Sequence, residues 1–417
     1  MSDLSSKRPS AFLPAAGWVP LPGRSQVRLT GADRAKFLHN FCTNDIKKLQ
    51  PGQGCEAFLT TIKGRILGHI FVFAGADDLM IDTVPGQDVK IRDHLDRYVI
   101  TEDVQIEVQT DSFRCVYLFG SAWPTILHDG IALDVGGLAQ YQQVQNEQYH
   151  LTIRRMDLVG TIGFEILMPP SAVDALMSAF QLREESGRPQ QVAADVFNAF
   201  HIDAGFPTYG IDLTDDHLAQ EAARTAQAIS FTKGCYLGQE PIARIDALGH
   251  VNRELRVVAF DNAEALTAPC KVRDASTKAE LGTLTSVGRV PDSATVGMGM
   301  VRTSAHPGTS IIASTDKGEF TGQGRRASVG HSADVACSRR RKRQPVGGSA
   351  FVSDPFNEHS PLPGSNGLTG RRPQDHLAVI EHLHDRVGES SIVSEDPPNG
   401  RQRHVASQKL IERIEFR

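Results

Sequence analysis

Paired cysteines, long apolar runs and a signal-like N-terminus are all missing from this sequence of 417 residues. The six cysteines are scattered without a CxxC pair, so neither a disulfide framework nor a cysteine-rich zinc site is expected. No apolar run approaches the roughly 20 residues that span a membrane, and the first residues lack the basic-then-apolar pattern of a secretion signal. We therefore expect free thiols in a cytoplasmic protein without a membrane partner.

The sequence also has no excess of positive charge. The formal net charge is −5, which argues against broad, direct contact with nucleic acid. Hydrophobic residues make up 40% of the chain and charged residues 22%, the ordinary composition of a globular protein. Because the chain is too long for one small core, we expect two or three domains.

Alternating apolar positions predict strands through the first half of the chain, with helices between them. The strands are expected at 27–31, 55–62, 65–73, 79–84, 104–110, 114–119, 149–156 and 164–168, and the helices at 34–41, 89–98, 171–182 and 191–204. This order is typical of an α+β fold with antiparallel strands and helices on one face. Five further short strands between residues 255 and 313, at hairpin spacing, predict a small β-barrel.

The composition changes again after residue 320, where Gly, Ser, Arg and Pro become frequent. Such a segment buries little apolar surface, so disorder is expected, and its histidines His376, His382 and His384 are interpreted as solvated rather than metal-binding. Two interpretations of the tail stay open: an extension, or a shifted reading frame that omits the last barrel strand. The expected organisation is a lead-in over 1–24, a two-lobed region over 25–250, the barrel over 251–320 and the tail over 321–417.

The stretch from Phe231 to Leu255 concentrates reactive side chains around a glycine-framed loop. Cys235 lies between Gly234 and Gly238, and Pro241 fits the first turn of a helix that Gly249 would end. A thiol beside Lys233 and near a helix N-terminus loses its proton more easily than an isolated one. The pattern therefore predicts a functional Cys235, with Lys233 assisting it, although a small buried hydrophobic cysteine is the alternative.

The sequence Lys-Gly-Cys-Tyr-Leu-Gly-Gln-Glu-Pro-Ile-Ala-Arg at 233–244 closely resembles the signature of the YgfZ-type folate-binding proteins, relatives of the glycine-cleavage T-protein. Further landmarks of the family occur in the same order at 27–45, 61–66, 163–166 and 202–207. The resemblance covers about residues 25–320. It implies two α+β lobes and a C-terminal β-barrel around a central channel that holds tetrahydrofolate.

The resemblance also implies which side chains hold the folate. A pterin offers N–H donors that a buried carboxylate accepts, and Asp203 and Glu165 are the candidates. The carboxylates of the folate tail suit Arg244 or Arg253. Glu240, one helical turn from Arg244, is the fourth cofactor-binding candidate beside Asp203, Glu165 and Arg244. Each residue has a structural alternative: Asp203 as a helix-end ion pair, Glu165 as the partner of a nearby cation, and Arg244 as the partner of Glu240.

One departure from the family bears on activity. Where the aminomethyltransferases carry two aspartates, this chain has Gly68 and His69. Neither replaces a carboxylate, so His69 is interpreted as a structural histidine and aminomethyl transfer is disfavoured. The resemblance implies a tetrahydrofolate-binding protein that assists assembly or repair of iron–sulfur enzymes, which would be its partners, with an indirect effect on tRNA modification. An aminomethyltransferase and a non-catalytic folate-binding module remain the alternatives.

Overall fold

The computed structural model describes residues 8–147, 150–173, 176, 189–261 and 263–327. Most of the helix expected at 171–182, the expected tail from residue 328 onward and the tail histidines lie outside the described residues, so those predictions stay predictions. The described residues belong to one compact unit, Met1–Arg372. Within them, no helix combines the length and hydropathy needed to cross a bilayer.

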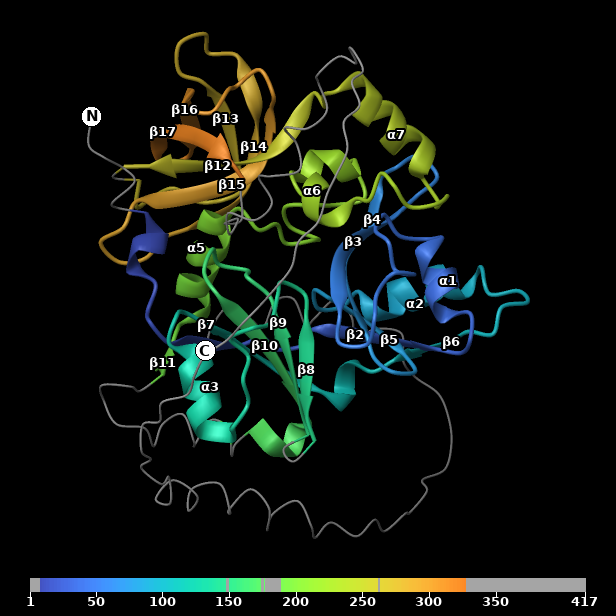
Figure 1. The fold of residues 1–417 in the computed structure, drawn as a ribbon. Coiled ribbons are helices and arrows are strands. Elements are labelled where there is room, and N and C mark those ends of the chain that lie inside the picture. The colour runs from blue at the N-terminus through green and yellow to red at the C-terminus, as the bar shows by residue number, and fades with distance from the viewer. Residues whose placement is uncertain (1–7, 148–149, 174–175, 177–188, 262, 328–417) are drawn as a thin grey trace, which may run out of the picture. The chain divides into compact units, whose positions relative to one another are not determined.

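The first lobe is a five-stranded antiparallel sheet in the order β3-β4-β5-β2-β6, with two helices (Figure 1). Its elements are β2 (Ser25–Thr30), α1 (Arg34–His39), β3 (Gly54–Thr60), β4 (Ile66–Ala74), β5 (Leu79–Thr83), α2 (Asp88–Asp96) and β6 (Gln105–Val108). Strands β3 and β4 form a hairpin in which Gly54 pairs with Phe73, Phe58 with His69 and Thr60 with Ile66. A buried core that includes Val27, Leu38 and Ile81 joins this sheet to α1 and α2.

The second lobe is a six-stranded sheet in the order β11-β1-β7-β10-β9-β8. Its elements are β1 (Gly17–Pro20), β7 (Arg114–Phe119), α3 (Trp123–Ile131), β8 (Gln143–Asn146), β9 (Leu151–Arg155), β10 (Gly163–Met168), β11 (Gln190–Gln191) and α5 (Ala194–Ala204). Strand β1 comes from the segment expected to be only a lead-in, and it pairs with β7 and β11. Its residue Trp18 is 5% exposed, so apolar burial explains why this segment is structured.

The C-terminal part is a closed barrel in the order β12-β15-β14-β13-β16-β17. Its strands are β12 (Arg253–Phe260), β13 (Cys270–Asp274), β14 (Glu280–Gly288), β15 (Thr295–Arg302), β16 (Ser310–Thr315) and β17 (Gly318–Arg326). The boundary expected at residue 320 is wrong, because β17 continues to Arg326 and pairs with both β12 and β16. The barrel therefore has its closing strand within this sequence.

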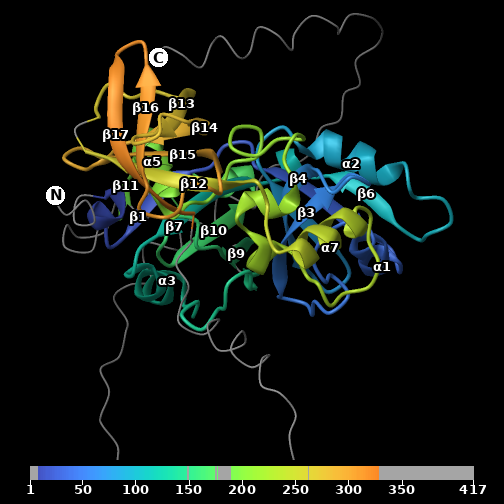
Figure 2. The same cartoon turned by 90° about the horizontal axis from the view of Figure 1, so that it is seen from above.

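Short helices connect the second lobe to the barrel. They are α6 (Thr225–Ala228), α7 (Gln239–Leu248) and the 3-10 helix η5 (Ala219–Ala222); three more 3-10 helices are η1 (Pro9–Phe12), η2 (Thr110–Ser112) and η3 (Pro170–Ala172). Helix α5 packs on β14 and β15, and α7 lies beside the β3–β4 turn in both views (Figures 1 and 2). The expected fold class, two α+β lobes followed by a small barrel, is confirmed.

Candidate functional site

A layer of buried charges joins the two sheets. Arg154, on β9, places Nη1 3.3 Å from Glu165 Oε2 on β10 and 3.3 Å from Asp82 Oδ2 on β5. Arg24 approaches Glu165 Oε1 at 3.3 Å and also pairs with Asp82. The carboxylates are fully buried and Arg154 is 3% exposed. Burial lowers the pKa of Arg154, an effect that the neighbouring Glu165 carboxylate opposes.

Glu165 is therefore paired with cations, as its structural alternative predicted. One of its two carboxylate oxygens, however, lacks a hydrogen-bond donor within the described part of the chain. Among the described residues Glu165 Oε1 has no hydrogen-bond partner, although Arg24 forms an ion pair with it. A buried carboxylate oxygen without a donor is uncommon, because the desolvation penalty is then not offset. This atom is an acceptor that a ligand's N–H group could satisfy.

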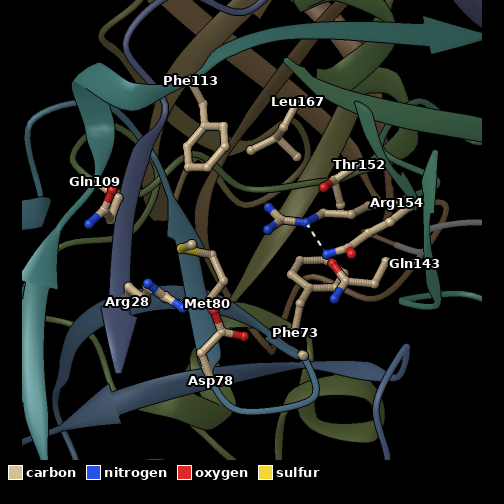
Figure 3. Close-up of a pocket in the computed structure, with 12 residues that line it drawn as sticks. Arg28, Phe73, Asp78, Met80, Gln109, Phe113, Gln143, Thr152, Arg154 and Leu167 are labelled. Carbon is tan, nitrogen blue, oxygen red and sulfur yellow. Dashed lines mark hydrogen bonds and ion pairs between the residues drawn. The ribbon is translucent and has the colours of Figure 1, made fainter. Parts of the chain in front are cut away.

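A pocket of about 290 Å³ opens on the other side of Arg154. Figure 3 shows Phe113 and Leu167 on one side of it, Arg28 and Asp78 on the opposite side, and Arg154 beside Gln143. The Arg28–Asp78 ion pair measures 2.7 Å, and Arg154 Nε donates to Gln143 Oε1 at 3.3 Å. The pocket thus combines ring and aliphatic surface with a few fixed polar groups, the usual make-up of a small-molecule site.

A second buried charge cluster lies in the middle of the β3–β4 hairpin. Glu56 accepts hydrogen bonds from both Arg224 Nε, at 2.7 Å, and Arg224 Nη2, and Tyr141 donates to its Oε2 at 2.6 Å. His69 Nε2 lies 2.8 Å from Glu56 Oε1. Burial alone would raise the pKa of the Glu56 carboxyl, but Arg224 and His69 outweigh burial and hold that pKa below its usual range.

His69 occupies the position where the aminomethyltransferases carry an aspartate. It is 3% exposed, bonded to Glu56, and its ring packs against Phe58, Phe71 and Phe206. The interpretation of His69 as a structural histidine is confirmed. The neighbouring Gly68 adds no functional group, so this strand supplies no free carboxylate at either position.

The Cys235 loop docks on α1 and on the Thr60 end of the hairpin. Lys233 is buried, and its ammonium donates to the carbonyl oxygens of His39, Cys42 and Asn44 at 2.5, 2.7 and 2.9 Å. Burial lowers the pKa of this ammonium. Because all three N–H donors are used on backbone carbonyls, Lys233 anchors the loop and does not face a substrate. Cys235 itself is exposed.

Two glycines shape the helix that follows Cys235. Gly238 has a φ of +86° and precedes α7, and Gly249, at φ +81°, ends it. Pro241 lies in the first turn, as expected. Glu240 and Arg244 are both exposed on α7, and Arg253 pairs with Glu221 at 2.9 Å. None of these three side chains belongs to the buried layer around Glu165.

Asp203 lies at the end of α5, apart from Glu165. Its Oδ1 accepts from Arg8 Nε at 3.0 Å and from Arg325 Nη2 at 2.6 Å, and its Oδ2 accepts from the Ser10 N–H at 3.0 Å. Both oxygens of this fully buried carboxylate are therefore occupied by protein donors. The structural alternative, an ion pair at the helix end, describes what is observed.

The six predicted site residues thus fall at three separate places. Glu165 lies in the layer between the sheets, Asp203 at the junction with the barrel, and Lys233, Cys235, Glu240 and Arg244 on the loop and helix at the far end of the hairpin. The sequence reasoning missed the charged residues that surround Glu165 and Glu56, namely Arg24, Asp82, Arg154 and Arg224. Asp82 and Arg154 had a sequence signal, a charge on an otherwise apolar strand, whereas Arg24 and Arg224 lie outside the strands and had none.

Comparisons with known proteins agree with this architecture. The model of the GCVT N-terminal domain family matches residues 15–233. The chain is 26% identical to a putative chloroplastic transferase of Arabidopsis thaliana over 57% of this chain and 54% of the relative. It is 26% identical to the tRNA-modifying protein YgfZ of Sodalis glossinidius, over 59% and 72%, and 22% identical to an aminomethyltransferase of Lysinibacillus sphaericus, over 54% and 63%.

The chain thus spans between about half and two thirds of the length of the first curated relatives that it matches. Among solved structures, the glycine cleavage aminomethyltransferase T of Bartonella henselae aligns with a TM-score of 0.66 at 21% identity, over 76% of this chain and 86% of that one. That likeness shows the shared fold. The family match, the YgfZ relative and the common fold together make this chain a YgfZ-type member of the glycine-cleavage T-protein superfamily.

Proposed function

We propose that this protein binds a reduced folate between its two lobes and supports iron–sulfur enzymes without transferring an aminomethyl group itself. The observation that carries the proposal is the buried Glu165 carboxylate, whose Oε1 has no hydrogen-bond partner among the described residues. Glu165 stands directly behind Arg154, which lines the pocket between the sheets. Relatives named aminomethyltransferase and tRNA-modifying protein YgfZ give the proposal its family context.

The residues around the pocket fit the chemistry of a folate. Glu165 does not itself line the pocket, so a pterin N–H would have to reach past Arg154 to its Oε1. Phe113 offers a ring for stacking, and Arg28 offers a guanidinium to a carboxylate. The volume of about 290 Å³ suits the ring system, with the tail extending outside. When bound, a reduced folate supplies a carrier for one-carbon groups.

The chain's own residues would hold this ligand in place. Arg154 fixes the Glu165 carboxylate through Oε2, which leaves Oε1 to accept from the ligand. Arg24 pairs with both Asp82 and Glu165, which keeps the layer close to charge balance. Aminomethyl transfer is disfavoured, because His69 is buried against phenylalanine rings and does not replace the carboxylate that the transferases use.

In this proposal Cys235 does not contact the folate. The loop rests on Thr60, whose hydroxyl donates to Leu237 O at 2.7 Å, whereas the pocket touches Phe73 at the opposite end of the same hairpin. Six residues along a strand span roughly 20 Å. The exposed thiol would therefore meet an iron–sulfur client or assembly factor at the surface, rather than the folate.

The binding step is tested with purified full-length protein and 5-formyltetrahydrofolate in isothermal titration calorimetry. We expect Glu165→Gln to weaken binding roughly tenfold or more, because a charge-assisted hydrogen bond is lost. Glu107→Gln is the matched control, since Glu107 is exposed on β6. Equal affinities of the two variants, with unchanged melting temperatures, would contradict the role of Glu165.

The cellular role is tested by deletion and complementation. Loss of the gene should lower the activity of a radical iron–sulfur methylthiotransferase, and Cys235→Ala should fail to restore it. Unchanged activity in the deletion strain would remove the iron–sulfur role. Full complementation by Cys235→Ala, with intact folate affinity, would favour a non-catalytic binding module instead.

An aminomethyltransferase is the second candidate, favoured by the similarity to enzymes of that name and by the shared fold. The test is an assay of the purified protein with tetrahydrofolate and an aminomethyl or N-methyl donor. An aminomethyltransferase would transfer a one-carbon group from that donor onto tetrahydrofolate. Measurable transfer that disappears in Glu165→Gln would establish this activity in place of the first proposal.

A further inference from the structure

A second cavity, of about 390 Å³, lies where the end of α7 meets the rim of the barrel. Its lining shares no residue with the pocket between the sheets. The walls come from the end of α7 and the segment after it, from β12, from the segment after β15 and from the last residue of β17, with Gln220 and Thr225 completing them. The cavity is therefore a feature of the barrel junction.

Two arginines face this cavity from adjacent strands. Arg256 on β12 and Arg326 on β17 are direct partners in the antiparallel register, so their side chains leave the same face of the barrel. Like charges directly opposite each other are unfavourable. Arg256 is 5% exposed; burial lowers its pKa, Glu254 opposes that effect, and Arg326 adds to it. No carboxylate among the described residues pairs with Arg326.

The cavity wall also holds two buried polar atoms that lack partners among residues 8–327 as described. Arg256 uses Nη2 on Glu254 Oε2 at 3.0 Å, but its Nε–H has no acceptor. Gln220 donates Nε2 to the carbonyl oxygen of Ile242 at 2.6 Å, but its Oε1 has no donor. Two residues that line the cavity therefore hold a buried donor and a buried acceptor without partners among the described residues, and both side chains are more than nine-tenths buried.

We propose that this cavity binds a phosphorylated small molecule, with its phosphate held by Arg256 and Arg326. Phosphate oxygens accept from guanidinium groups in a planar, bidentate manner. A phosphate monoester in its monoanionic form also carries one P–OH, which can donate to Gln220 Oε1; a carboxylate has no such donor. The ligand's negative charge relieves the arginine pair that the strand register forces together. This proposal is independent of folate binding.

The acidic residues of the cavity limit what it accepts. Glu254 and Asp246 also line it, and Glu254 is already paired with Arg256. The formal charges of these two carboxylates offset those of Arg256 and Arg326. A bare polyanion is therefore disfavoured, whereas a single phosphate group on a neutral organic body would contact the arginine pair alone and suits the volume.

The test uses the full chain, with glycerol 3-phosphate as the probe and glutamate as a carboxylate comparison, at constant ionic strength in titration calorimetry. We expect saturable binding of glycerol 3-phosphate that weakens roughly tenfold in Arg326→Gln. Arg302→Gln is the control, because Arg302 is also exposed, lies on the barrel and does not line the cavity. Arg302→Gln should bind as the wild type does.

Arg326→Gln carries the test because Arg326 is exposed and its loss should not unfold the barrel. Arg256→Gln, checked for folding by its melting curve, should abolish binding. Three outcomes would overturn the proposal: no saturable binding by the wild type, equal weakening in Arg326→Gln and Arg302→Gln, or tighter binding of glutamate than of glycerol 3-phosphate.

Discussion

Arg325 donates to the Asp203 carboxylate at 2.6 Å and thereby ties the last strand of the barrel to the end of α5. Arg8 and the Ser10 N–H reach the same carboxylate from the N-terminal segment, each at 3.0 Å. Three parts of the chain that are far apart in sequence converge on one buried side chain. Asp203 is thus a structural junction between the second lobe and the barrel.

Replacing Asp203 with Asn should destabilise the protein by roughly 2–3 kcal/mol, the usual worth of hydrogen bonds to a charged group. The measurement is the free energy of unfolding from urea denaturation. Asp195→Asn serves as the control, since Asp195 is exposed in the first turn of the same helix, and it should change stability by at most about 0.5 kcal/mol. A similar effect of the two substitutions would show that the junction contributes little.

The same carboxylate predicts an acid dependence. Burial raises the pKa of Asp203, but Arg325, Arg8 and Ser10 outweigh burial, so its pKa in the folded state lies below its ordinary value. The ionised form therefore adds stability above the unfolded pKa of about 3.9, and that stability is lost as the pH falls through the folded pKa. The stability difference between wild type and Asp203→Asn should shrink below about pH 4; a constant difference would argue against the assignment.

Arg224 and Glu56 form a buried pair whose members depend on each other. Arg224→Met leaves the Glu56 carboxylate buried without its main cation and should cost about 3–5 kcal/mol of unfolding free energy. The double variant Glu56→Gln with Arg224→Met removes both charges, so it should be more stable than Arg224→Met alone. Additive losses in chemical denaturation would show that the pair is not coupled.

Substitutions of Lys233 and Cys235 should have different effects: the first should lower stability and the second should abolish function. Lys233→Met leaves three backbone carbonyls without their donor and should cost roughly 3 kcal/mol in thermal or chemical unfolding. Cys235→Ser, at an exposed position, should change stability by less than about 0.5 kcal/mol yet abolish complementation in cells. A strong stability loss in Cys235→Ser would instead indicate a packing role for the thiol.

The glycines that bound α7 provide a matched pair. Both have positive φ, so either substitution by alanine should cost about 1 kcal/mol for the left-handed conformation. At Gly238 an added Cβ would also press against Thr61 O and Thr60, whereas at Gly249 it would meet nothing within 4 Å. Gly238→Ala should therefore be clearly more destabilising than Gly249→Ala in urea denaturation, and equal losses would contradict the close approach of the loop to β3.

Alternating apolar residues predicted most strands of both lobes, because β2, β4, β5, β7 and β10 bury one or both faces. Strand β17 was missed because its sequence, Gly318–Arg326, is polar and rich in glycine. Gly322 explains this composition: a Cβ there would collide with the carbonyl of Ala259 and the ring of Phe260 on β12. Close packing between barrel strands thus favours glycine in β17, and this gives the strand the composition of a linker.

The candidate site was only partly predictable for a different reason. Glu165 was a candidate because it belongs to a recognisable motif, and the Gly68–His69 departure was visible in the sequence itself. Arg154 and Arg224 acquire their roles by meeting carboxylates on other strands, and Arg224 is 168 residues away from Glu56. Such pairing depends on the register and on the contact between the two sheets, which no local pattern encodes. The pairing of Asp203 was unpredictable for the same reason, since Arg8 and Arg325 come from opposite ends of the described chain.

Strand β1 gives the molecule a nested chain order. The chain first enters the second sheet at Gly17–Pro20, leaves it to build the whole first lobe, and returns to pair β7 with β1. The first lobe is therefore an insertion within the second. A cut near residue 112 would take an interior strand from the second sheet and separate Asp82 from Arg154. The second lobe is thus discontinuous in sequence, and a fragment that starts after the first lobe would lack strand β1.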